Sequence, residues 1–214
     1  MIVAAAVCPH PPVLVPELAS GAASELDDVR SAALESVTAL VATRPDRIVV
    51  IGTGELPDPV DESAGGTLAG HGVDVRAGGD DLVLPLSHTI GAWLLDQAGW
   101  DGPRTYTTTA VPTDDRVALL VMAGGSARRS LAAPGYLDER AEAHDAAIGA
   151  ALASGDTDAL ASLDVHLADE LLAPGPHALV VLGEMTKGAD VTATLRWDGA
   201  PFGVGYWVAD WVVS

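Results

Sequence analysis

Cysteine and lysine are almost absent from this chain, because Cys8 and Lys187 are the only residues of either type. A single cysteine excludes a disulfide within the chain and a zinc site built from several thiolates. Arginine does not replace the missing lysine, since 11 basic residues face 30 acidic ones and the formal net charge is -19 at pH 7. Phosphate contacts require clustered cations, so this balance argues against nucleic acid or an anionic membrane as a partner.

Long hydrophobic runs are also missing. No apolar stretch reaches the length that a membrane-spanning helix needs, and no basic and apolar signal segment opens the sequence. We therefore expect a cytoplasmic protein. Hydrophobic residues nevertheless make up 49% of the 214 residues, which is enough for one substantial core, and no shift in composition divides the chain. We expect a single domain over residues 1–214.

Strands and helices are predicted to alternate along the chain. Uninterrupted apolar runs predict buried strands at 2–7, 47–51 and 116–122, and a weaker pattern predicts one at 105–111. Apolar residues at helical spacing predict helices at 24–44, 87–98 and 137–173, the last with a break at Gly155-Asp156. Strands without alternation are typical of sheets that helices cover on both faces. The expected fold is α/β, with a central, largely parallel or mixed sheet.

Three other segments complete this prediction. Residues 56–79 are rich in Gly, Asp and Pro and are expected to form a long surface loop without regular structure. Periodicity does not decide between strand and helix for 177–185. Residues 191–197 and 203–213 are expected to form a closing hairpin around an Asp198-Gly199 turn.

The first predicted strand ends in Cys8-Pro9-His10-Pro11-Pro12. Pro9 and Pro11 restrict the backbone around His10, so the imidazole is presented on a stiff loop. Ligands of open α/β sheets bind at the carboxyl ends of the strands, where His10 is expected to lie with the glycine-rich exits of the second and third buried strands. The residues alone leave two interpretations of His10 open, a functional histidine or an incidental one in a rigid turn.

Four segments carry recognisable motifs, which are Ala-Val-Cys-Pro-His-Pro-Pro-Val-Leu-Val-Pro-Glu at 6–17, Arg-Ile-Val-Val-Ile-Gly-Thr-Gly at 47–54, Val-Met-Ala-Gly-Gly-Ser-Ala-Arg-Arg at 121–129 and Ala-Pro-Phe-Gly-Val-Gly-Tyr at 200–206. Together they resemble the class III extradiol ring-cleavage dioxygenase superfamily. The resemblance covers most of the chain, and its most specific element is His-Pro-Pro. It implies a single α/β domain and, in active members, a non-haem Fe(II) held by two histidines and a carboxylate.

The functional residues of that superfamily are mostly unmatched here. His10 matches its first metal histidine, but Gly52-Thr53-Gly54 stands where the second histidine is expected. Ala127 replaces the catalytic acid/base histidine, and a proline precedes His177 where the third ligand is expected. A rebuilt site would need His10, Glu55 and either His177 or His71, which are the two histidines and one carboxylate that suit Fe(II) or another divalent metal. We take His10, Glu55 and His177 as the candidate ligands.

Two functions follow from these observations. The first is a divergent, non-catalytic protein with a degraded Fe(II) site, which binds a small molecule or a protein partner in the same cleft and forms a homo-oligomer through an apolar face. The second is an active metal-dependent dioxygenase or related enzyme that acts on a small aromatic substrate at a rebuilt site around His10. Ser126 and Arg128 are candidates for binding an anionic ligand, although the acidic composition favours the alternative that Arg128 and Arg129 pair with local acids. The remaining histidines, His88, His144 and His166, are interpreted as structural or surface residues.

Overall fold

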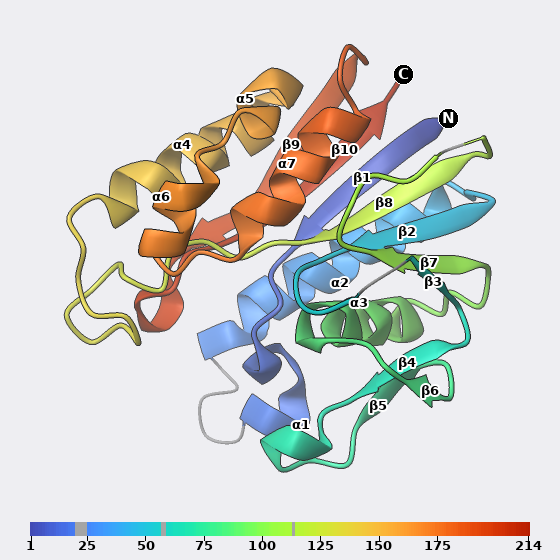
Figure 1. Ribbon diagram of the computed structural model, residues 1–214, viewed down its shortest axis with the longest axis horizontal. Helices are drawn as coiled ribbons and strands as arrows, with labels where there is room; N and C mark the ends of the chain where they lie inside the picture. The colour runs from blue at the N-terminus through green and yellow to red at the C-terminus, as the bar shows by residue number, and fades with distance from the viewer. Residues whose placement is uncertain (20–24, 57–58, 113) are drawn as a thin grey trace.

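A mixed sheet of seven strands runs through the molecule in the order β3-β7-β2-β8-β1-β10-β9 (Figure 1). The structure is a computed structural model that describes residues 1–19, 25–56, 59–112 and 114–214. The strands of this sheet are β1 (Ile2–Cys8), β2 (Arg47–Ile51), β3 (Val60–Asp61), β7 (Arg104–Thr107), β8 (Val117–Met122), β9 (Val191–Gly199) and β10 (Tyr206–Val213). This arrangement confirms the α/β fold with a mixed central sheet in a single domain.

The centre of the sheet is parallel. Strand β8 pairs in parallel with β1 on one side and with β2 on the other, and β2 pairs in parallel with β7. Strands β3 and β10 are antiparallel to their neighbours β7 and β1, and β9 is antiparallel to β10. The predicted buried strands are therefore neighbours, so the loops that follow β1, β2 and β8 leave the sheet at the same edge.

Helices cover both faces of the sheet, as Figure 1 shows. Helices α2 (Asp27–Ala42) and α3 (Leu86–Gln97) lie on one face, and α4 (Ala141–Ser154) and α7 (Gly175–Met185) lie on the other. The short helices include α1 (Pro16–Ala19), α5 (Thr157–Ala161), α6 (Val165–Glu170) and 3-10 turns at Pro12–Leu14, Ala69–His71 and Pro201–Gly203. Within the described ranges, no helix combines the length and the apolar composition needed to cross a membrane.

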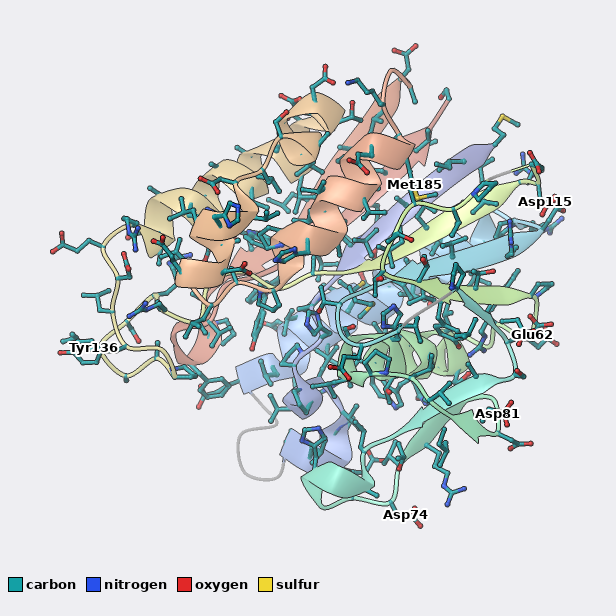
Figure 2. The ribbon with its side chains drawn as sticks, viewed as in Figure 1. Glu62, Asp74, Asp81, Asp115, Tyr136 and Met185 are labelled. Carbon is teal, nitrogen blue, oxygen red and sulfur yellow. The ribbon has the colours of Figure 1, made fainter. Side chains whose placement is uncertain are left out.

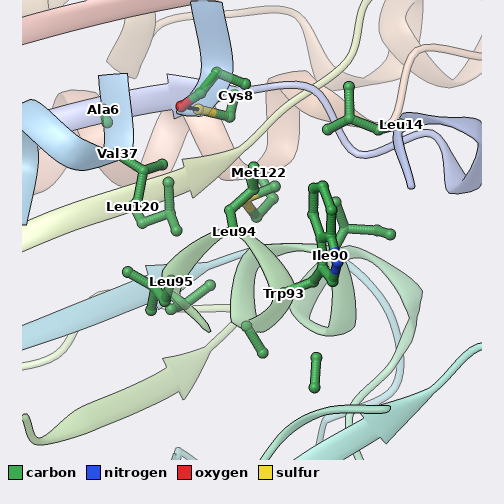
Figure 3. Close-up of a cluster of buried hydrophobic side chains, with 14 of the residues drawn as sticks. Ala6, Cys8, Leu14, Val37, Ile90, Trp93, Leu94, Leu95, Leu120 and Met122 are labelled. Atoms are coloured by element: carbon green, nitrogen blue, oxygen red, sulfur yellow. Dashed lines mark hydrogen bonds between the residues drawn. The ribbon is translucent and has the colours of Figure 1, made fainter. Parts of the chain in front are cut away.

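Successive residues of the central strands point into two separate cores. In β8, Leu120 packs with α2 and α3, whereas Leu119 packs with α4 and α7. The acidic residues that Figure 2 labels, Glu62, Asp74, Asp81 and Asp115, are exposed at the surface. Figure 3 shows the first core, where Val37 from α2 and Leu94 from α3 meet the side chains of β1 and β8. Because both faces of the central strands are buried, polar and apolar residues do not alternate along these strands.

The segment 56–79 was predicted to be irregular, and this prediction is wrong. It contains β3, β4 (Ala64–Thr67) and β5 (Arg76–Gly78), and β4 forms a second sheet with β5 and with β6 (Asp81–Leu82). Its glycines have a packing reason, because a Cβ on Gly66 would lie 1.9 Å from Thr89 Oγ1 on α3. The glycine-rich composition that is typical of a loop therefore allows the second sheet to approach α3 closely.

Other boundaries also differ from the prediction. Residues 137–173 hold three helices rather than one with a single break, and 177–185 belong to the helix α7. Strands β9 and β10 do pair as a closing antiparallel unit, but Asp198 and Gly199 are the last residues of β9, and a longer connection with the 3-10 turn Pro201–Gly203 joins the strands. Helix α2 begins at Asp27, and its predicted start at residue 24 lies outside the described residues.

Candidate functional site

A hollow of about 260 Å³ lies where β1 and β8 leave the sheet. Its lining comes from distant parts of the chain and is largely apolar. The lining includes His10, Gly124, Ala127, Leu172, Pro174 and Tyr206. Tyr206 is 6% exposed, and burial raises the pKa of its phenol to about 12, so this group remains uncharged. Among the described residues that line the hollow, His10 carries the only basic side chain.

The His10 ring has one buried nitrogen and one open nitrogen. Nδ1 is buried and has no hydrogen-bond partner in the described residues. No hydrogen bond joins Nε2 to the residues that the structure describes. Because the ring lines the hollow and Nδ1 is buried, we infer that Nε2 is the nitrogen that a ligand in the hollow would meet.

Burial keeps this imidazole uncharged. Desolvation is the main cause that lowers the pKa of His10 to about 4, and the nearby His88 adds charge repulsion. A neutral imidazole protonates only one nitrogen. A buried N–H without an acceptor is rarer in proteins than a buried acceptor without a donor, so the environment favours a bare Nδ1 and a protonated Nε2.

His88 is close enough to His10 to help lower the pKa of that imidazole, and the sequence prediction missed this connection to the site. It is fully buried on α3, its Nε2 is 2.9 Å from the carbonyl oxygen of Thr107, and its pKa is lowered by desolvation. A Cβ on Gly52 would lie 3.0 Å from His88 Cε1, so the glycine at the end of β2 makes room for this ring. His88 was interpreted as structural or surface, and its buried hydrogen bond agrees with a structural role beneath the site.

A buried acid holds the glycine-rich loop that follows β8. Asp145, 1% exposed on α4, accepts a hydrogen bond from the backbone N–H of Ser126 at 3.0 Å and pairs with Arg129 at 3.1 Å. Burial raises the pKa of Asp145, while both partners oppose that shift. A Cβ on Gly205 would lie 2.2 Å from Asp145 Oδ2, so no larger residue fits where β10 meets this loop.

Ser126 and Arg128, the predicted anion-binding residues, are used by the protein itself. The Ser126 hydroxyl is fully buried and donates to the carbonyl oxygen of Leu171 at 2.7 Å. The Arg128 side chain donates to the carbonyl oxygen of Glu170 at 2.9 Å. Arg129 pairs with acids, as the alternative interpretation expected. Neither Ser126 nor Arg128 lines the hollow around His10.

The proposed metal ligands are not assembled into one site. Glu55 is exposed after β2, and His71 is exposed in a 3-10 turn. His177 is 45% exposed and pairs with Asp169 at 2.9 Å. Throughout the residues that the structure describes, no group of three or more His, Cys, Asp or Glu side chains is placed to hold a metal ion. The donors present therefore do not fit an Fe(II) site with two histidines and a carboxylate.

A second, more polar hollow of about 320 Å³ adjoins the first and shares Pro174 with it. Its lining includes His177, Asp169 and the Gly52-Thr53-Gly54 turn. The structure thus brings His10 and His177 to the same edge of the sheet but places them in different hollows. Leu172 and Tyr206 were missed as site residues because nothing in their local sequence connects them to His10.

Comparison with known proteins adds no family or relative. No protein-family model matches the chain, and no curated protein matches it.

Proposed function

We propose that this chain binds a small, uncharged molecule in the hollow around His10 without a metal ion. On this proposal it is a non-catalytic protein built like the class III extradiol dioxygenases that its sequence resembles. The observation that carries the proposal is the neutral His10 imidazole, which is open to an apolar hollow at Nε2 and carries no hydrogen bond from the described residues.

The hollow favours a particular kind of ligand. A protonated Nε2 donates a hydrogen bond, so the ligand offers an acceptor such as a carbonyl oxygen. The apolar lining and the net charge of -19 disfavour an anion. An apolar cavity of roughly 150 Å³ holds one benzene ring, and the hollow of about 260 Å³ is larger. An uncharged aromatic ketone is therefore a suitable probe.

The residues around the hollow support binding rather than ring cleavage. Ring cleavage at a bound Fe(II) needs a complete set of ligands and a nearby group that moves protons. The His10, Glu55 and His177 set is not assembled, and Ala127, which lines the hollow, cannot transfer a proton.

Calorimetric titration with acetophenone and with ethylbenzene tests the proposal. Both probes carry one aromatic ring, but only acetophenone has an acceptor oxygen. A net hydrogen bond of about 0.5 to 1.5 kcal/mol predicts roughly two- to tenfold tighter binding of acetophenone. The substitution His10→Leu should remove that preference while keeping an apolar wall, whereas His71→Leu, at an exposed histidine outside the hollow, should preserve it.

Two results would contradict the proposal. Equal binding of both probes to the wild type, or no binding of either, shows that Nε2 of His10 does not recognise a ligand. An anaerobic titration with Fe(II) tests the alternative of a rebuilt metal site. One equivalent of tightly bound Fe(II) that is lost in His10→Leu would favour the metal-dependent enzyme instead.

A further inference from the structure

Four large apolar side chains are exposed on the segments that follow β8, α6 and β9. Leu131 is 64% exposed, Tyr136 63%, Leu172 51% and Phe202 42%, and we call these four residues the apolar rim. Leu172 belongs to the rim and also lines the hollow. Figure 2 shows Tyr136 pointing outward at the end of the loop that follows β8. Exposed apolar groups gathered at a hollow are typical of binding surfaces.

The segments that carry the rim are joined to one another. Ala127 donates its backbone N–H to the carbonyl oxygen of Leu172 at 3.3 Å, and Gly135, beside Tyr136, donates to the carbonyl oxygen of Ala127 at 2.9 Å. Arg129 donates to the carbonyl oxygen of Gly203, beside Phe202, at 3.0 Å. These bonds join three segments that are far apart in the sequence, and two of the bonded residues, Ala127 and Leu172, line the hollow.

Backbone strain is concentrated in the same residues. Tyr136, Leu172 and Phe202 have φ values of 60°, 53° and 56°, and Arg44 is the one other non-glycine residue with a positive φ in the described chain. A left-handed backbone costs roughly 1–2 kcal/mol for such residues. Glycine or asparagine would avoid this cost, yet each position carries a large side chain that remains exposed. Strain of this kind gathers at ligand-binding sites.

Two arginines on the segment that follows β8 are engaged in ion pairs. Arg129 pairs with Asp145 and Glu142, and Arg140 pairs with Asp138 at 2.9 Å and with Glu170 at 2.8 Å. A charged partner would have to displace these pairs. An uncharged occupant that continues from the hollow through Leu172 covers the apolar surface without doing so.

We propose that the ligand carries an alkyl chain that leaves the hollow past Leu172 and lies against the apolar rim. The protein then binds an uncharged, lipid-like molecule whose acceptor oxygen meets His10 and whose chain covers Tyr136 and Phe202. This inference rests on the proposed function and specifies the class of its ligand.

A chain-length series tests the inference. Acetophenone, para-butylacetophenone and para-octylacetophenone share one head group and differ in their alkyl chain. Each methylene that is buried should tighten binding up to about fourfold, and the wild type should show a continued gain from the butyl to the octyl compound. Calorimetric titration below the aggregation limit of each compound measures this gain.

A double variant, Tyr136→Asn with Phe202→Asn, removes two rim side chains that do not line the hollow. Asparagine tolerates the left-handed backbone, so the variant is expected to fold. It should bind acetophenone as the wild type does but bind the octyl compound at least tenfold more weakly than the wild type does. The control Val212→Asn changes a 56% exposed side chain at the start of the β1–β10 pairing, away from His10, and should behave as the wild type does.

The outcomes separate this inference from the proposed function. If acetophenone binds but affinity stops rising at the butyl compound, or if the double variant keeps the full gain, the alkyl chain does not lie on the rim. The rim would then be assigned to another occupant, such as a protein partner. If acetophenone itself fails to bind, both the proposed function and this inference are overturned.

Discussion

His10 combines properties that are unfavourable for an isolated side chain. Its Nδ1 is buried without a partner in the described residues, and its ring lies near a second buried histidine, His88. An unpaired buried polar atom costs roughly 1–3 kcal/mol. The surrounding prolines prevent the ring from relaxing into solvent, because they hold the loop after β1 stiff. The result is a neutral donor at the edge of an apolar hollow.

The lowered pKa of His10 predicts a specific loss of stability in acid. The pKa is about 4 in the folded state and roughly 6.5 in the unfolded chain. The unfolded state binds the proton at a higher pH than the folded state does. The contribution of the neutral His10 to the free energy of unfolding is therefore complete above pH ~6.5 and is lost as the pH falls towards ~4. The free energy of unfolding of the wild type should therefore fall by about 2 to 3 kcal/mol relative to that of His10→Leu across this window.

Urea unfolding of both proteins at a series of pH values measures this difference. His88 is present in both, so its own lowered pKa largely cancels in the comparison. A constant difference between the two proteins from pH ~7 to ~4 would mean that His10 is not desolvated in the folded state.

At the scale of elements, the loop after β8 owes its shape to one acid on another element. Asp145 on α4 accepts the N–H of Ser126 and lies against Gly125 and Gly205. The loop therefore forms one wall of the hollow and is not free to close over it. Its two consecutive glycines differ in their surroundings, which allows a matched test.

The substitution Gly125→Ala should destabilise the fold, whereas Gly124→Ala should not. A Cβ on Gly125 would lie 2.9 Å from both Asp145 Oδ1 and Trp207 Cη2, and both side chains are buried. Such overpacking costs about 1–3 kcal/mol. The nearest atom to a Cβ on Gly124 is 3.9 Å away, on Tyr206. Urea unfolding compares the two variants, and equal stabilities would contradict the described position of Asp145.

The elements that could be predicted from sequence are those whose secondary structure is determined by their own residues. The strand predicted at 47–51 matches β2, and that at 116–122 contains β8, because uninterrupted apolar runs indicate strands buried on both faces. The sheet formed by β4, β5 and β6 could not be predicted. Gly66 is explained by its close contact with Thr89 on α3, which depends on tertiary packing and not on the local sequence.

The same limit applies to the site. His10 was identified from the prolines that flank it and from its place after a strand. Leu172 and Tyr206 lie far along the chain and reach the hollow only through packing. Glu55 and His177 were chosen for their chemistry, but Glu55 is exposed and His177 pairs with Asp169 outside the His10 hollow. Residue type alone did not indicate which side chains converge.

At the scale of the whole molecule, two cores on opposite faces leave one edge of the parallel strands for binding. Helices α2 and α3 cover one face and α4 and α7 cover the other, so ligands can reach the sheet at the ends of its strands, and the loops after β1, β2 and β8 form one such end. Both hollows at this edge share Pro174. The fold thus concentrates its candidate binding surface where an α/β sheet usually binds ligands.

The most direct test of this account is nitrogen NMR of the His10 imidazole, with and without acetophenone, at neutral pH. We predict one bare and one protonated ring nitrogen in the free protein, with the proton on Nε2, and a shift of the Nε2–H signal when acetophenone binds. Two protonated nitrogens, a proton on Nδ1, or an Nε2–H signal that does not respond to bound acetophenone would contradict recognition of an uncharged ligand by His10.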